Sequence, residues 1–200
     1  MLFSPPKLNL CTEFAQLKEQ VMSENNMLKK VVQLDQSLFL MLFNGNAPKW
    51  LKNSALGFSK TGNGGLYVLI AVGFGWLSSE AELRLMAMTL LLGFLIERPI
   101  YYVAKNSFAR IRPCDCLVKG AYITPSDKFS LPSGHSAGAF LVAVILAQYF
   151  PQFAELCFLW ATGVAASRVL LGVHFPVDVV LGALMGGSCG LLAILIVATL

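Results

Sequence analysis

The sequence contains two histidines, and each lies in a short polar motif within a strongly apolar region. His135 ends the motif Pro-Ser-Gly-His, and His174 lies four residues before Asp178. From residue 129 to the C-terminus, the charged residues are only Glu155, Arg168 and Asp178. Ionisable side chains are costly in an apolar environment, so those that persist there are candidates for function.

The second histidine motif reads Ser-Arg, five residues, His, three residues and Asp over residues 167–178. Pro176 suits the first turn of a helix, which predicts His174 just before that helix and Asp178 inside its first turn. A carboxylate near a histidine can hold one ring nitrogen protonated and leave the other basic or nucleophilic. Alternatively, Asp178 only stabilises the helix N-terminus and His174 lies at a membrane interface. The motif alone leaves both interpretations open.

Two further motifs could contact an anion. The start of a helix at Pro-Ser-Gly-His offers free N–H groups, and Gly134 allows a ligand to approach the backbone closely. Ser133 would equally serve as a plain N-cap. Lys105 and Arg112 are seven residues apart, about two helical turns, and could project from one helix face. By themselves, such cations at a helix end are typical of membrane anchoring.

Composition indicates the environment of these motifs. The chain has 200 residues, of which 56% are hydrophobic and 13% are charged, whereas soluble domains carry about 25% charged residues. We therefore expect one membrane domain with the lipid bilayer as its surroundings. The net charge of +4 is modest and forms no basic stripe, so we expect no nucleic-acid partner.

Apolar periodicity predicts an all-α fold, an integral-membrane helical bundle of about five transmembrane helices. The expected apolar segments cover about 65–79, 83–104, 134–150, 154–173 and 177–199. A spanning helix needs about 20 residues, so the first segment is short unless it starts near Leu56.

The N-terminal part differs in composition from the rest. Residues 1–36 are polar and mixed in charge, with apolar residues at roughly helical spacing. We expect an amphipathic helix there, lying on the membrane surface, against the bundle, or in solvent. Residues 37–43 are too short to span a bilayer and are expected at the interface. Residues 37–200 are expected to form the membrane-embedded domain.

Threading the five segments in alternate directions brings the motifs together. The second segment ends at Lys105, the third starts after Pro132, the fourth ends near Arg168, and the fifth starts after His174. All four ends then lie on the same side of the membrane. Two histidines, an aspartate and three long cations on one face fit phosphoryl chemistry better than anchoring, since cations stabilise a transferring phosphoryl group.

The three motifs resemble the signatures of the type 2 phosphatidic acid phosphatase family: Lys-x6-Arg-Pro, Pro-Ser-Gly-His and Ser-Arg-x5-His-x3-Asp. All three match without a gap or substitution, in the family's order, over residues 105–178. The resemblance implies that His174 attacks phosphorus and forms a phosphohistidine, with Asp178 orienting and charging it. It also implies that His135 protonates the leaving oxygen and later activates water.

The same resemblance assigns the phosphate contacts. The side chains implied to hold the phosphate oxygens are Lys105, Arg112, Ser133 and Arg168, together with the backbone N–H of Gly134. Ser167 is implied to bind phosphate or to support Arg168. The family requires no metal, and this chain shows no clustered carboxylate, histidine or cysteine ligand set, so we expect no cofactor.

The resemblance implies a membrane phosphatase that cleaves a lipid phosphate or pyrophosphate, with undecaprenyl diphosphate as the first candidate substrate because compact members of the family often act on it. Phosphatidic acid and phosphatidylglycerol phosphate come next, and phosphoryl transfer to another lipid remains open. Soluble vanadium haloperoxidases share the motifs, but the apolar segments disfavour them. The least favoured alternative is a non-catalytic protein that binds lipid phosphates.

We expect a multi-pass protein of the bacterial inner (plasma) membrane. The sequence leaves open its oligomeric state and the side that the site faces. The lysine excess of residues 1–64 favours the cytoplasm, whereas the family resemblance favours the outer face.

Overall fold

The computed structural model describes residues 26–43, 45–77, 80–118, 121–125 and 127–199, and within these ranges it contains helices and loops but no strand. The helices are α2 (Asn26–Leu42), α3 (Lys49–Thr61), α4 (Gly64–Leu77), α5 (Ala81–Phe108), α6 (Pro113–Cys116), α7 (Gly134–Tyr149), the 3₁₀ helix η1 (Pro151–Phe153), α8 (Ala154–Leu170) and α9 (Pro176–Val197). The all-α prediction is confirmed for the described residues. The five expected apolar segments correspond to α4, α5, α7, α8 and α9.

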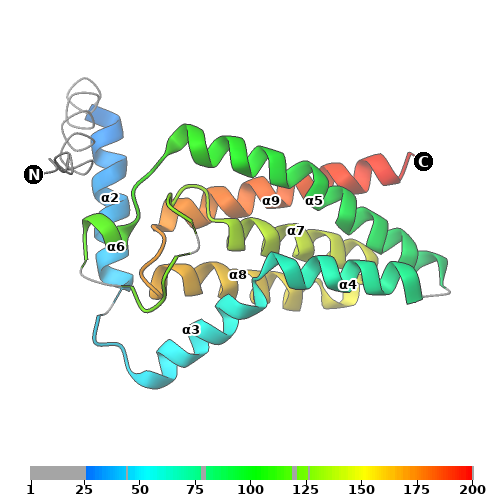
Figure 1. Ribbon diagram of the computed structural model, residues 1–200, viewed down its shortest axis with the longest axis horizontal. Helices are drawn as coiled ribbons and strands as arrows, with labels where there is room; N and C mark the ends of the chain where they lie inside the picture. Colours follow the sequence, from blue (N-terminus) through cyan, green and yellow to red (C-terminus); the bar gives the residue numbers. More distant parts are fainter. Residues whose placement is uncertain (1–25, 44, 78–79, 119–120, 126, 200) are drawn as a thin grey trace, which may run out of the picture.

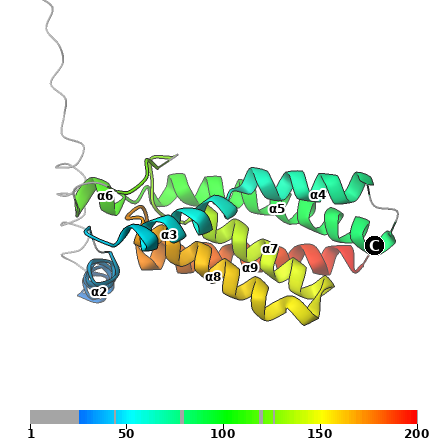
Figure 2. The ribbon, with the colours of Figure 1, turned by 90° about the horizontal axis from the view of Figure 1, so that it is seen from below.

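Helix α7 occupies the centre of the bundle, where it packs against α5, α8 and α9. The two views agree that the long helices run roughly alongside one another (Figures 1 and 2). Small residues on several sides of α7 are buried, including Ala137, Gly138, Ala139 and Ala143. Because these side chains are short, neighbouring helices can approach α7 closely from several directions.

The closest of these approaches is between α7 and α9. Gly182, Gly186 and Gly190 recur every four residues along α9, so they lie on one face. A Cβ atom at Gly182 or Gly186 would collide with the α7 backbone or the residue preceding it. The two backbones can therefore meet only because these positions are glycine, and this contact brings the start of α9 against the start of α7.

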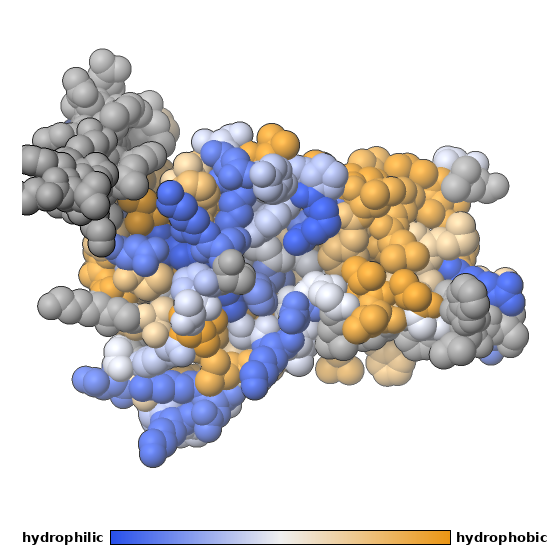
Figure 3. Space-filling model, in the orientation of Figure 1, coloured by the Kyte–Doolittle hydropathy of each residue, from blue (hydrophilic) through white to orange (hydrophobic). Residues whose placement is uncertain are grey.

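The outer faces of the long helices are apolar. Leu95 of α5, Leu159 of α8 and Leu195 of α9 each expose more than 60% of their surface. Figure 3 shows that the half of this face away from α2 and α6 is mostly hydrophobic, whereas hydrophilic residues gather toward the other end. Contiguous apolar surface of this kind fits a bilayer rather than water.

Two helical segments in the described chain have the length and composition of a membrane span, Pro151–Leu170 and Pro176–Val197. Gly134–Tyr149 is apolar but shorter. Helix α5 is long enough but carries several charges, including the buried Glu97, which pairs with Arg98 at 2.5 Å. The number of about five spans therefore stays a prediction.

Helix α2 lies across one end of the bundle, crossing the direction of the long helices (Figures 1 and 2). It continues across the boundary expected between residues 36 and 37, and it buries Asp35 and Phe39 while leaving Val31 and Leu38 exposed. Exposed apolar residues on a helix of this orientation suit a membrane interface. The rest of the expected amphipathic segment, residues 1–25, lies outside the described residues.

Candidate active site

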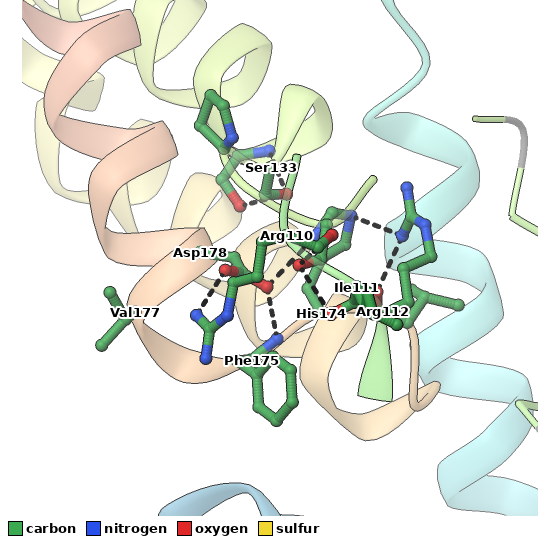
Figure 4. A network of polar contacts seen from close by, with 12 residues as sticks. Arg110, Ile111, Arg112, Ser133, His174, Phe175, Val177 and Asp178 are labelled. Carbon is green, nitrogen blue, oxygen red and sulfur yellow. Dashed lines mark hydrogen bonds and ion pairs between the residues drawn. The ribbon is translucent and has the colours of Figure 1, made fainter. Parts of the chain in front are cut away.

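The three polar motifs meet at one end of the bundle, as the threading of the apolar segments predicted. Nη1 of Arg112 lies 3.2 Å from Nε2 of His174 and donates to the carbonyl of Val173 at 2.7 Å. The N–H of Ser133 donates to the carbonyl of Asp178 at 3.0 Å. Figure 4 shows these residues converging from separate segments of the chain. The structure thus joins all three motifs in one network.

Local sequence signals place each motif at a helix end. Helix α5 stops at Ala109, which has a left-handed backbone with φ 42°, and Pro113 starts α6 directly after Arg112. Helix α8 is followed by Gly172 at φ 80°, a conformation that glycine adopts at little cost. Pro176 then starts α9. His174 therefore lies in a short turn fixed on both sides.

His174 is buried, with 2% of its surface exposed. Its Nε2 faces Arg112, and its Nδ1 lies 3.7 Å from Oδ2 of Asp178. Burial lowers the pKa of His174 to about 4; Asp178 opposes this shift and the charge of Arg112 adds to it. The ring is therefore neutral at pH 7, the form in which a histidine nitrogen carries a free lone pair.

Asp178 is fully buried in the first turn of α9. Its Oδ2 accepts from the N–H of Phe175 at 2.8 Å, and its Oδ1 pairs with Arg110 at 2.7 Å. Nδ1 of His174 has no hydrogen-bond partner in the part of the chain that the structure describes. Asp178 is thus placed beside His174, as expected, but stands slightly beyond hydrogen-bond distance.

Three buried cations interact electrostatically with the pair of His174 and Asp178. The fractional exposures are 6% for Lys105, 1% for Arg112 and 4% for Arg168. Asp127 forms ion pairs with both Lys105 and Arg112. Burial by itself would raise the pKa of Asp127, but hydrogen bonds from Lys105 and Tyr101 outweigh it and hold that pKa at about 2. The carboxylate is therefore charged, and it takes the place that an anionic ligand of these cations would occupy.

Arg168 has no such carboxylate partner among the described residues. Its Nη1 donates to Oγ of Ser59 in α3 at 2.5 Å, and its Nε has no hydrogen-bond partner in the described chain. Buried charges are normally paired. Among the described residues, Asp127 is thus the carboxylate that pairs within the cluster of Lys105, Arg112 and Arg168. The cluster therefore keeps a net positive charge, which suits an anion.

The hydroxyls expected at the phosphate are engaged within their own helices. Ser133 caps α7, accepting from the N–H of Ser136 at 3.4 Å and from its hydroxyl at 3.0 Å. Ser167 donates to the carbonyl of Val164 at 2.6 Å. Gly134 lies against the ring of Tyr101, where a Cβ would be tightly crowded.

His135 lines a pocket with a volume of about 400 Å³ that adjoins the cation cluster through Tyr101. The pocket lies between the glycine-rich break at 62–65, helix α5 and the start of α7. A Cβ at Gly62 would come within 3.2 Å of the His135 ring. The break between α3 and α4 therefore leaves space beside this histidine, next to the site of His174.

Several residues of the site were not expected from the sequence. They are Asp35, Ser59, Tyr101, Arg110 and Asp127, all of which contact an expected site residue or its direct partner. Arg110 and Asp127 lie within residues 105–132, where charged residues are frequent, but that pattern does not reveal the partner of either one. Asp35 and Ser59 carry no sequence signal of their own.

Comparisons with known proteins identify the family and the fold of this chain. A family model described as the PAP2 superfamily matches residues 82–200. The undecaprenyl-diphosphatase of Sulfolobus acidocaldarius is 33% identical over 125 residues, which cover 58% of this chain and 57% of that protein. The lipid A 1-phosphatase of Rhizobium etli is 38% identical over 71 residues, 34% of this chain and 30% of that protein. The matches thus span about 57% and 30% of the lengths of these two curated relatives.

Two solved structures share the fold. Aquifex aeolicus LpxE has a TM-score of 0.66 and 27% identity, over 79% of this chain and 93% of that one. The transmembrane PAP2-type phosphatidylglycerolphosphate phosphatase of Bacillus subtilis has a TM-score of 0.67 and 25% identity, over 94% of each chain. Because the family model covers more than half of the sequence and all three motifs, the chain belongs to the PAP2 superfamily.

Proposed function

We propose that this protein is a membrane phosphatase that hydrolyses a lipid phosphate or pyrophosphate through a phosphohistidine at His174. The observation that carries the proposal is the buried, neutral His174, whose Nε2 faces Arg112 in a cluster of cations short of negative charge. A nucleophile beside preorganised cations is the arrangement that phosphoryl transfer needs.

In the proposed reaction, Nε2 of His174 attacks phosphorus and the bond to the lipid oxygen, or to the bridging pyrophosphate oxygen, breaks. His135 gives a proton to the departing oxygen, and Asp178 stabilises the cationic phosphohistidine ring. Water, activated by His135, then displaces the phosphate from His174 and restores the free enzyme. The products are inorganic phosphate and the lipid with one phosphate fewer.

The phosphate contacts follow from the cation cluster. The substrate's phosphate replaces the Asp127 carboxylate as partner of Lys105 and Arg112 and gives Arg168 the anion it lacks. Ser133, the N–H of Gly134 and Ser167 are proposed to complete the cradle. Ser133 accepts its present hydrogen bonds and can direct its own proton to a phosphate oxygen, whereas Ser167 must first release the carbonyl of Val164.

Undecaprenyl diphosphate is the first candidate substrate, supported by the Sulfolobus relative of that name. Phosphatidylglycerol phosphate is the second, supported by the Bacillus structure, which aligns over 94% of each chain. We propose an inner-membrane location with α4, α5, α7, α8 and α9 as the spans, supported by the apolar faces of these helices.

The proposed activity is tested by phosphate release from a panel of lipid phosphates and diphosphates in detergent, with each substrate measured both with and without EDTA. We expect turnover of at least one prenyl diphosphate or phospholipid phosphate at the same rate with and without EDTA. The reason is that Lys105, Arg112 and Arg168 supply the charge stabilisation that a divalent ion otherwise provides. Tight binding without turnover on every substrate would favour a binding protein, and EDTA inhibition reversed by one metal would contradict the metal-free mechanism.

The pH dependence of kcat/KM is expected to show an acid limb near pH 4. His174 is neutral above its pKa of about 4, and protonation as the pH falls through that value removes the lone pair of Nε2. An ordinary histidine would instead give a limb near pH 6.5. Ionisation of the substrate phosphate near pH 6 is measured separately and divided out. A corrected limb at pH 6 or above would contradict the assignment, provided that enzyme returned from pH 4 to pH 7 regains full activity.

A further inference from the structure

Arg110 lies between two buried carboxylates at the edge of the site. Its Nη1 is 2.7 Å from Oδ1 of Asp178, and its Nη2 is 2.6 Å from Oδ2 of Asp35. Its guanidinium also stacks over the ring of Phe175, with Cζ 4.1 Å from the ring centre. Figure 4 shows Arg110 beside Asp178. The family signature Lys-x6-Arg-Pro leaves the position of Arg110 undefined, so the motif does not account for this network.

Asp178 meets Arg110 and His174 through different oxygens. Oδ1 pairs with Arg110, whereas Oδ2 accepts from the N–H of Phe175 and faces Nδ1 of His174 at 3.7 Å. An N–H···O hydrogen bond requires a separation of about 2.7–3.2 Å. A shift of well under 1 Å or a small rotation of the carboxylate therefore decides whether His174 gains its partner, so the groups that hold Asp178 control that contact.

Asp35 anchors the network from outside the three motifs. It comes from α2, is 2% exposed, and its Oδ1 accepts from the N–H of Val177 at 2.9 Å. Asp35 therefore contacts both Arg110 and the first turn of α9, and that turn contains Asp178. Removing one member would leave a buried charge without its partner, which is costly, so the three side chains hold one another in place.

We propose that Asp35, acting through Arg110, positions Asp178 against Nδ1 of His174, which makes helix α2 a working part of the active site. The inference rests on the proposed phosphohistidine mechanism, in which His174 becomes cationic and needs a fixed carboxylate. Arg110 and Asp35 are positioning residues, because their contacts reach the reacting nitrogen only through Asp178.

The test compares Arg110→Gln, Arg110→Lys and Asp35→Asn with wild type on the best lipid phosphate. We expect kcat to fall on the order of 100-fold in Arg110→Gln and roughly 10-fold in Asp35→Asn, with KM changed less than about threefold, because sub-ångström misplacement of a catalytic group slows the chemical step. Arg110→Lys keeps the cation but can serve only one carboxylate well, so it should fall between Arg110→Gln and wild type.

The acid limb of kcat/KM separates positioning from general loss of structure. The charged or titratable groups facing His174 are Asp178, Arg112, Arg168 and His135, and they are the same in every variant. Without the positive charge of Arg110, the negative charge of Asp178 stabilises protonated His174 more strongly. The acid limb of kcat/KM should therefore move to higher pH in Arg110→Gln. In Asp35→Asn, Arg110 pairs with Asp178 alone, so the limb should not rise.

Matched controls remove one charge each at the same end of the molecule. Lys52→Gln takes away a cation that lies over the ring of Tyr122, and Asp115→Asn takes away an exposed carboxylate on α6. Both should keep the wild-type kcat and acid limb.

Three outcomes would overturn the positioning role: a kcat within twofold of wild type in Arg110→Gln, a lowered kcat with an unmoved limb in that variant, or a main effect on KM. If Arg110→Gln does not fold, Arg110→Lys and Asp35→Asn decide, and wild-type kcat in both rejects the role. Absence of turnover in wild type instead rejects the proposed function, which keeps the two failures apart.

Discussion

Replacing His174 with alanine is expected to reduce lipid phosphate turnover by on the order of 10⁴-fold or more, since removal of a nucleophile abolishes the covalent route. No other described side chain combines burial, neutrality and a nitrogen facing Arg112. The wild-type enzyme, quenched during turnover of a ³²P-labelled substrate, should carry label that is lost in acid and stable in base. His174→Ala should carry none.

The control for this experiment is His174→Asn, which keeps a polar side chain in the buried turn and should be equally inactive. Both variants should elute from a sizing column as wild type does. Near-normal turnover by either folded variant, or label that persists in it, would show that phosphate passes through another group.

Replacing His135 with alanine is expected to slow hydrolysis by about 10²–10⁴-fold for lipid substrates, the usual contribution of a general acid or base. The loss in the phosphorylation step should be much smaller for an activated aryl phosphate, because its leaving oxygen departs without a proton. The two steps are separated by a burst measurement, in which phenol release reports phosphorylation and phosphate release reports hydrolysis of the intermediate.

In this measurement His135→Ala should retain the phenol burst but slow phosphate release, because water then lacks its base. A matched comparison is His135→Gln, which fills the same half-buried place beside Gly62 without a titrating nitrogen. If His135→Ala slowed phosphorylation of the enzyme equally for the aryl phosphate and for the lipid phosphate, that result would count against the general-acid role.

The sequence by itself determined the five long apolar helices and the order of the motifs, because both depend on local patterns. Long apolar runs fixed α4, α5, α7, α8 and α9, while Pro176 and Pro132 marked helix starts. Alternating direction along those runs then placed Lys105, Arg112 and His174 at one end. The spacing within each motif was sufficient to predict the family.

The sequence did not determine the number of spans. Helix α4 has only 14 residues, and α5 contains several charged residues, including the buried Glu97, which pairs with Arg98. Length and composition therefore do not decide whether either helix crosses a bilayer. Helix α3 was also not predicted, because its polar, amphipathic segment lacks the apolar run that marked the others.

Only the tertiary structure decided which charges meet. Arg110 joins Asp178 across 68 residues and Asp35 across 75, and Arg168 meets Ser59 across 109. Asp35 and Ser59 are each one of several polar residues in their helices, and no periodic signal singles them out or reveals their partners. Their partners depend on how α2 and α3 pack against the bundle and which face each turns inward. Packing of distant helices, rather than any local preference, therefore fixed the residues that hold His174 and its aspartate in place.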